Sequence, residues 1–242
     1  MDADLLRQYL EFYQDLGIRT LYRLAAVEKT EPPPAALAPA SQASALPPLS
    51  PANDSLLKIL EDIGDCRRCR LHAGRGKLVF GVGDEHAPLV FVGEGPGADE
   101  DAQGIPFVGR AGQLLTQMIE NTAKKEGIPL VREQVYICNV VKCRPPENRT
   151  PEADEMEICG QFLARQLSTI HPKAICALGG TAARALTGHK EGVTKMRGKW
   201  FQWREVPVMV TYHPSYLLRQ YNQASKREAW EDLKKLLHFV YD

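Results

Sequence analysis

The feature that most constrains the fold is a series of short apolar runs separated by helical patterns. Five runs read as strands, and in chain order they are "APLVFVGE", "QVYICNVV", "KAICALG", "WFQWRE" and "VPVMVTYH". Segments between them carry helix signals, such as the apolar face and terminal lysines of "RAGQLLTQMIENTAKKEG". Strands that alternate with helices predict a mostly parallel sheet with helices on both faces, which is a three-layer α/β/α sandwich of the α/β class.

The residues at which these runs end indicate where a ligand would bind. In open α/β sheets, ligands bind beyond the carboxyl ends of the strands. The runs end at Gly93, at Asn139 to Lys142, at Gly179 and at His213. We therefore expect a site that is built from these strand ends and from the loops that follow them.

The N-terminal part of the chain differs in composition from the rest. Residues 32–51, "PPPAALAPASQASALPPLSP", hold seven of the 17 prolines, which is typical of a semi-extended linker. Before it, apolar residues recur at helical spacing over residues 5–16. We predict an amphipathic helical segment over residues 1–30, a linker over residues 31–53 and a catalytic domain over residues 54–242. The helix either binds a protein partner or covers a patch of its own domain.

The charge of the chain is balanced, with 30 Lys+Arg and 30 Asp+Glu. No overall field therefore points to nucleic acid or to a membrane, although local basic patches are compatible with this balance. No run approaches the ~18 apolar residues that span a bilayer, and the acidic start "MDADLLRQYLEFYQDLG" is unlike a secretory signal. We expect a soluble, cytoplasmic protein whose six cysteines stay reduced.

Four cysteines are placed so that they can bind one metal centre. Cys66 and Cys69 form "CRRC" on a short turn after a helix, whereas a thioredoxin-like redox motif would follow a strand. Cys143 lies in a polar loop and Cys159 in the helix after it, so both sulfurs can reach that turn. Four thiolates suit zinc and a [4Fe–4S] cluster equally, so the spacing leaves the metal open. The other two cysteines lie inside apolar strands, where a thiol is a small hydrophobe: Cys138 and Cys176.

A glycine-rich loop, "GEGPGADEDAQGIPFVGRAG" at residues 93–112, follows the first of the predicted strands. A glycine-rich turn after a strand usually suggests a phosphate site. This loop instead carries four carboxylates within residues 94–101 and has no cation before Arg110. Its charge therefore suits a positive centre better than a bound phosphate.

Three motifs and the four cysteines, in matching order, carry a resemblance to a known family. The motifs are "GEGPGADEDAQGIPFVGRAG", "NVVKCRPPENRTP" and "HPSYLL". From about residue 54 to its C-terminus the chain resembles the family 4 uracil-DNA glycosylases, the iron–sulfur members of that superfamily. The resemblance implies a uracil-DNA glycosylase-like fold and a [4Fe–4S] cluster on Cys66, Cys69, Cys143 and Cys159. It also implies a nucleoid-associated enzyme of base excision repair that flips uracil from single- or double-stranded DNA, hydrolyses its N-glycosidic bond and leaves an abasic site.

The resemblance also implies which residues bind the base. Gly93 and Gly95 let the backbone approach a flat ring, and peptide N–H groups there can hold a uracil carbonyl. Phe107, which follows Pro106, is expected to stack on the flipped base and to stabilise it by about 1–3 kcal/mol. Asn139 can accept from uracil N3–H and donate to O4, whereas cytosine presents the opposite pattern. We therefore expect a strong exclusion of cytosine.

Three side chains are implied as catalytic. Glu94 and Glu100 at the pocket wall can stabilise the oxocarbenium character of the sugar and position a water. His213 can donate to uracil O2 and stabilise the departing anion. Glu100 is also our candidate for the group that excludes the methyl of thymine, because Gly97 stands where the best-known uracil glycosylases have a blocking tyrosine. Leu217 is expected to enter the duplex as an apolar wedge.

Basic side chains near the strand ends predict a local DNA-binding rim. They are Lys142, Arg144, Arg149, Lys195, Arg197, Lys199 and Arg219. Two alternatives of other classes stay open: an iron–sulfur electron-transfer protein and a non-catalytic DNA-binding protein. The first leaves the acidic loop, Asn139 and "HPSYLL" without a role. The second would be a relative that captures DNA through a histidine in a basic insertion. The corresponding stretch of this chain, "CRPPENRTP", has neither the insertion nor the histidine.

Overall fold

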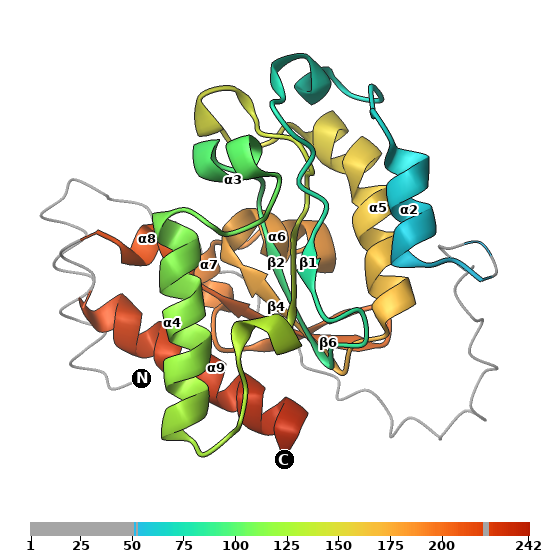
Figure 1. Cartoon of the computed structure of the whole chain (residues 1–242). Helices are drawn as coiled ribbons and strands as arrows, with labels where there is room; N and C mark the ends of the chain where they lie inside the picture. Colours follow the sequence, from blue (N-terminus) through green and yellow to red (C-terminus); the bar gives the residue numbers. More distant parts are fainter. Residues whose placement is uncertain (1–50, 52, 220–222) are drawn as a thin grey trace, which may run out of the picture. The chain divides into compact units, whose positions relative to one another are not determined.

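The computed structural model describes residue 51, residues 53–219 and residues 223–242. A six-stranded sheet organises these residues, with the strand order β1-β3-β2-β4-β6-β5 (Figure 1). The strands are β1 (Val82–Gly83), β2 (Leu89–Gly93), β3 (Tyr136–Asn139), β4 (Ala174–Leu178), β5 (Trp200–Trp203) and β6 (Val206–Thr211). The strands β3, β2, β4 and β6 are parallel, and the two edge strands run antiparallel to their neighbours. The prediction of a mostly parallel sheet is confirmed.

Helices cover both faces of the sheet. The longer ones are α2 (Leu56–Ile63), α4 (Arg110–Lys125), α5 (Ala153–Ile170), α6 (Gly179–Thr187) and α9 (Gln223–Tyr241). Short helices lie in the connections: α3 (Ala98–Gln103), α7 (Val193–Met196), α8 (Pro214–Leu217), η1 (Arg70–Gly74), η2 (Arg132–Gln134) and η3 (Pro146–Asn148). α2, α5 and α6 share one hydrophobic core with the sheet, and α4 and α9 share another on the opposite face (Figure 1). The three layers are those that the sequence predicts.

The buried strands send alternate side chains into the two cores. In β2, Val90 and Val92 belong to the core of α2, α5 and α6, whereas Leu89 and Phe91 belong to the core of α4 and α9. All four side chains are fully buried. A strand with both faces covered has no solvated side, which explains why the run is apolar throughout.

The start of α5 differs from the prediction. Its sequence predicts a cap at Thr150 with Pro151 as the first helical residue. The helix instead begins at Ala153, because the side chain of Glu155 accepts a hydrogen bond from the Glu152 N–H at 2.8 Å. Glu155 is in turn bound by Arg149 of the preceding loop, so local contacts of Glu155 accompany the later start.

The register of the sheet brings the loops of the parallel strands to one edge. Gly93 pairs with Asn139 across β2 and β3, and Leu178 pairs with Thr211 across β4 and β6. The chain leaves all four strands at nearly the same level. This edge is the one at which ligands of open α/β sheets bind.

The N-terminal segment lies outside the described residues. The helix predicted within residues 1–30 falls there, as does the linker predicted over residues 31–53 apart from residues 51 and 53. The chain divides into the units Met1–Ala45 and Leu46–Asp242, and the described residues belong to the second. The predicted segment bounds and the protein partner of the helix stay predictions. Among the described residues, no helix has the length and apolar character needed to cross a membrane.

Candidate active site and cysteine cavity

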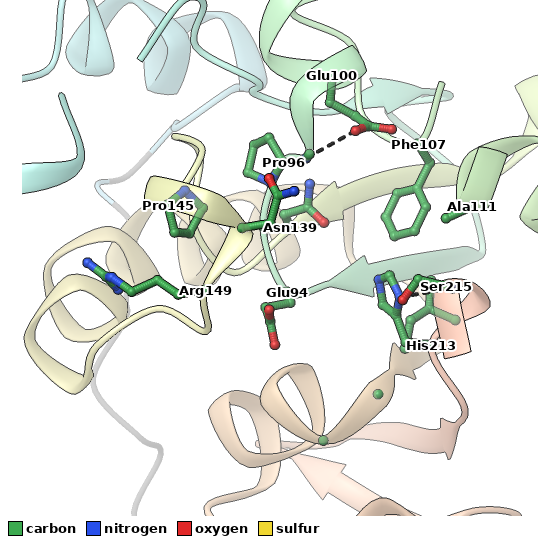
Figure 2. Close-up of a pocket in the computed structure, with 16 residues that line it drawn as sticks. Glu94, Pro96, Glu100, Phe107, Ala111, Asn139, Pro145, Arg149, His213 and Ser215 are labelled. Carbon is green, nitrogen blue, oxygen red and sulfur yellow. Dashed lines mark hydrogen bonds between the residues drawn. The ribbon is translucent and has the colours of Figure 1, made fainter. Parts of the chain in front are cut away.

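The loops at the carboxyl ends of the four parallel strands enclose a pocket of about 340 Å³ (Figure 2). Glu94 follows β2, Asn139 ends β3, Gly179 follows β4 and His213 lies beyond β6, and all four residues line the pocket. The rest of the lining is Gly95, Pro96, Gly97, Glu100, Phe107, Ala111, Pro145, Asn148, Arg149, Leu178, Gly180 and Ser215. The structure thus brings the predicted base-binding and catalytic side chains together in one cavity.

Asn139 carries an unpaired acceptor at this pocket. The residue is 1% exposed, and its Oδ1 has no hydrogen-bond partner among the described residues. Gly93 lies beside it, and a side chain at Gly93 would collide with Asn139 Oδ1 and with the ring of Phe107. Buried polar atoms in folded proteins are almost always paired. The unpaired oxygen therefore indicates a ligand that brings an N–H donor to this point.

The ring of Phe107 forms part of the pocket wall, on a backbone that is in the left-handed region with φ of 55°. Bulky residues rarely adopt this conformation unless the surrounding structure holds it. Glu100 supplies such a constraint, because its carboxylate accepts hydrogen bonds from the N–H groups of Gly97, Val108 and Gly109, each at 3.0 Å. Figure 2 shows the first of these bonds. Glu100 therefore fixes the loop on both sides of Phe107.

Glu94 is oriented by the first turns of α6. The hydroxyl of Thr181 donates to Glu94 Oε2, and Thr181 is 5% exposed. Arg184, one turn further along the helix, donates to the Thr181 hydroxyl at 3.4 Å. The carboxylate of Glu94 thus lies at the N-terminal turn of α6, where a helix favours negative charge. Thr181 has no sequence signal of its own, and the sequence did not predict its contact with Glu94.

His213 is a neutral donor at neutral pH. The Ser215 N–H donates to His213 Nδ1 at 3.2 Å, and the Ser215 hydroxyl lies 2.8 Å from the same nitrogen. Because Nδ1 accepts the backbone N–H, the proton of the neutral ring is on Nε2. Burial lowers the pKa of His213 to about 4, against an opposing effect of the nearby Glu100. The ring of Phe107 lies beside it, with centroids 5.7 Å apart.

The loop between β3 and α5 supplies lining that the sequence did not predict as part of the pocket. Asn148, with φ of 55°, accepts from Arg144 Nε at 2.8 Å. Arg149 donates twice to the fully buried Glu155, at 2.8 and 2.7 Å. Figure 2 shows Arg149 across the pocket from Phe107. The turn residues of "RPPENR" indicate a loop, but they carry no signal for the side of the pocket to which it folds.

The predicted DNA wedge, Leu217, is buried. It is 1% exposed and packs with Tyr212 and Ala229 in a small core beside α4. The residue before it, Tyr216, is 39% exposed. A side chain enclosed in this way is not presented to DNA, so the structure does not support the assignment of Leu217. Spacing within "HPSYLL" does not tell which side of the short helix faces the core.

Two of the predicted rim cations are held by groups inside the protein. Lys142 is 1% exposed, and its ammonium donates to the backbone oxygen of Asn139 at 2.8 Å and to Gln166 Oε1 at 2.6 Å. Arg197 is bound to the buried carboxylate of Asp232. Burial therefore removes Lys142 from the predicted rim, whereas the other predicted cations are at least partly exposed: Arg144, Arg149, Lys195, Arg197, Lys199 and Arg219.

The four predicted metal ligands line a second, smaller cavity: Cys66, Cys69, Cys143 and Cys159. Arg75 Nη1 donates to Cys143 Sγ at 3.2 Å, and the Lys142 N–H donates to Cys159 Sγ at 3.3 Å. Burial raises the pKa of the Cys143 thiol and raises that of Cys159 to about 11. Donors aimed at sulfur favour the thiolate, which is the form that binds metal. Within the described part of the chain, no three His, Cys, Asp or Glu side chains converge on a single ion position.

The remaining two cysteines behave as their sequence context predicts. Cys138 lies inside β3 and Cys176 inside β4, and both are buried in the hydrophobic cores. Burial raises the pKa of each thiol, which keeps both protonated. Neither lines the smaller cavity.

The fold and the pocket define an α/β protein with a cavity beyond the carboxyl ends of its parallel strands, where a buried amide oxygen without a partner among the described residues and an aromatic ring belong to the lining. The sequence profile of the uracil DNA glycosylase superfamily matches residues 80–234. The type-4 uracil-DNA glycosylase of Thermotoga maritima is 46% identical over 77% of this chain and 96% of the relative. That of Archaeoglobus fulgidus is 43% identical over 76% and 92%, and the type-5 uracil-DNA glycosylase of Pyrobaculum aerophilum is 31% identical over 59% and 67%. The chain belongs to the uracil DNA glycosylase superfamily and, within it, to the type-4 family.

Proposed function

We propose that this protein excises uracil from DNA by hydrolysing the N-glycosidic bond, and that it leaves an abasic site for base excision repair. The observation that carries the proposal is the unpaired, buried Oδ1 of Asn139, in one pocket with Phe107 and with a neutral histidine. The names of the type-4 relatives support it. We also propose that the protein works in the cytoplasm, at the nucleoid.

Uracil suits the pocket by its pattern of donors and acceptors. Its N3–H can donate to Asn139 Oδ1, and its O4 can accept from the amide nitrogen, while Phe107 stacks on the ring. Cytosine has an acceptor at N3 and an amino group at C4, so both contacts with Asn139 would be lost. Each unpaired polar group would cost about 1–3 kcal/mol in a buried site, and together they exclude cytosine. The absence of a side chain at Gly93 lets Asn139 and the ring of Phe107 approach the backbone of β2 closely.

His213 stabilises the departing base. When the glycosidic bond breaks, uracil keeps the bonding electrons and negative charge develops on O2. The Nε2–H of neutral His213 donates to this oxygen and stabilises the anion without a prior proton transfer. Because Ser215 holds the ring through Nδ1, the donor is oriented before the reaction begins.

Glu94 complements the sugar. As the base leaves, the sugar gains oxocarbenium character, which a carboxylate stabilises while it positions the water that adds to C1′. Thr181 holds Oε2 of Glu94, which leaves Oε1 for that water. Glu100 uses its oxygens to bind the loop, so we propose that it acts through the position of Phe107 rather than by contact with a water or with a thymine methyl.

We also propose that Cys66, Cys69, Cys143 and Cys159 hold a [4Fe–4S] cluster. Four thiol groups around one cavity, two of them with N–H donors aimed at the sulfur, fit this group. All four thiolates would hold the cluster together, and the cluster would be a larger body than a single metal ion. When bound, the cluster supplies four bonds that join "CRRC" to α5 and to the loop that carries Arg149.

The first test is excision from an end-labelled oligonucleotide that holds one uracil, with cytosine, thymine and hypoxanthine in the same position as controls. We expect excision at uracil alone, and a loss of about 100-fold or more in His213→Ala. No excision by folded, iron-loaded wild-type protein would contradict the proposal and favour the DNA-binding or electron-transfer class. Excision of hypoxanthine at a similar rate would point to a glycosylase of broader range.

A further inference from the structure

One exposed aromatic side chain stands beside the pocket. α8 directly follows His213, and both His213 and Ser215 line the pocket. The next residue, Tyr216, is 39% exposed, whereas Leu217 is 1% exposed. Neighbouring residues of a helix point roughly 100° apart, so the burial of Leu217 turns Tyr216 away from the core and toward solvent.

The ring of Tyr216 is braced by its neighbours. The ring of Tyr212 stacks on it, with centroids 5.2 Å apart and planes at 27°. Tyr212 is itself 5% exposed, and its hydroxyl donates to Glu228 of α9 at 2.9 Å. The guanidinium of Arg219 lies 5.8 Å from the centroid of the Tyr216 ring. A side chain that is already held in place loses little conformational entropy when it meets a partner.

We propose that Tyr216 is the side chain that this protein inserts into duplex DNA, in the space that the flipped base leaves. This inference rests on the proposed excision of uracil from DNA. Extrusion of a base breaks its stacking on both neighbours, and an apolar wedge in the vacated space lowers the energy of the opened duplex. Tyr216 has the position, the exposure and the rigid support for this task, and the exposed Arg219 beside it can hold a neighbouring phosphate.

A second exposed apolar residue near the pocket provides the comparison. Ile105 is 42% exposed and lies two residues before Phe107, in the loop between α3 and α4. Its exposure is close to that of Tyr216, but Ile105 belongs to a different loop and has no aromatic ring. A matched pair of alanine variants at these two positions therefore separates a specific wedge from general exposure of apolar surface.

The test compares single-turnover excision of one uracil in a single strand and in a duplex with guanine opposite. We expect Tyr216→Ala to lower the duplex rate by about tenfold or more and the single-strand rate by less than about twofold, because only a duplex leaves a gap to fill. Tyr216→Phe retains the duplex rate. Ile105→Ala leaves the ratio of the two rates unchanged, and Leu217→Ala lowers the melting temperature without a change in that ratio.

A second readout follows the flipping step itself. A 2-aminopurine beside the uracil gains fluorescence when the stack opens, and we expect a smaller gain with Tyr216→Ala at an unchanged melting temperature of the protein. Equal losses on both substrates, no loss at all, or an equal duplex-specific loss in Ile105→Ala would overturn the assignment of Tyr216. Failure of the wild-type protein to excise uracil from either substrate would overturn the proposed function and this inference with it.

Discussion

At the residue scale, the choice of base depends on one side-chain amide. Asn139 is the last residue of β3, and its backbone oxygen is held by the buried ammonium of Lys142 at 2.8 Å. Asn139 and the ring of Phe107 lie so close to Gly93 on the neighbouring strand that no side chain would fit there. The surroundings therefore fix the amide before a base arrives. A base with the wrong pattern of donors and acceptors would leave buried polar groups unpaired, which costs binding free energy.

Asn139→Asp is expected to shift the preference from uracil toward cytosine. A carboxylate can accept from the cytosine amino group but cannot donate to uracil O4. We expect uracil excision to fall roughly 10- to 100-fold, as for one lost buried partner, while cytosine excision becomes detectable in matched oligonucleotides. Asn139→Ala serves as the control, since it should weaken uracil excision without admitting cytosine. An unchanged base preference in Asn139→Asp would show that Asn139 does not read the base.

The depressed pKa of His213 makes the stability of the protein depend on pH. Burial lowers this pKa from 6.5 to about 4, so between these values the unfolded chain binds a proton that the folded protein does not. Stability therefore falls as the pH falls through this window. Urea denaturation should show a loss of up to about 2 kcal/mol between pH 6.5 and 5 that His213→Gln removes. The excision rate of the wild type should show no inflection near pH 6.5, and an inflection there would contradict the neutral donor.

At the element scale, the loop between α3 and α4 is held in shape by Glu100. Glu100→Ala removes the acceptor of three backbone N–H groups and releases Phe107 from its positive φ. We expect uracil excision to fall about tenfold or more, without excision of thymine, because unpaired loop donors destabilise the bound geometry. Glu100→Gln retains an acceptor and should keep more activity than the alanine variant. Excision of thymine by Glu100→Ala would instead show that Glu100 blocks the methyl by direct contact.

Much of this architecture could be predicted because the elements are simple. β2, β3, β4 and β6 are covered on both faces, so their sequences are continuous apolar runs that stand out from the helical patterns. Parallel strands then bring Glu94, Asn139 and His213 to one edge of the sheet whatever the details of packing. The pocket residues at strand ends follow from topology alone.

The parts that could not be predicted depend on contacts that leave no residue pattern. Glu100 is bound by main-chain N–H groups, and every loop has such groups. Lys142 lies in a polar loop of the sequence, yet it is buried. Its ammonium group donates hydrogen bonds to oxygens of Asn139 and Gln166, which compensate for the loss of water. Leu217 faces inward because of the way the four-residue helix α8 is oriented. A single helical turn is too short for its sequence pattern to show which side faces the core.

At the scale of the whole molecule, the cysteine cavity joins distant parts of the chain. Cys66 and Cys69 precede η1, Cys143 follows β3 and Cys159 lies in α5. Bonds from all four cysteines to one cluster would close long loops of the chain. The free energy of binding the cluster would therefore add to the stability of the folded protein. We expect removal of iron to lower the melting temperature by roughly 5–15 °C, measured without air before and after chelation.

Two cysteine variants check this prediction. Cys143→Ser should lower both the iron content and the visible absorbance of the purified protein. Cys176→Ala is the matched control, because Cys176 is also buried but lies inside β4 and away from the smaller cavity. Full iron content in Cys143→Ser, or equal loss of iron in both variants, would contradict the proposed ligand set.

The last prediction concerns the N-terminal segment. The Thermotoga maritima relative is covered over 96% of its length by 77% of this chain, so about a quarter of the chain has no counterpart there. Every residue that lines the pocket lies between Glu94 and Ser215. A variant that begins at residue 46 is expected to excise uracil from short oligonucleotides within about twofold of the full chain, because a domain with its own core folds alone. A tenfold loss or an unfolded product would indicate that the segment covers a patch of its own domain, whereas equal activity would favour the other predicted role of its helix, the binding of a protein partner.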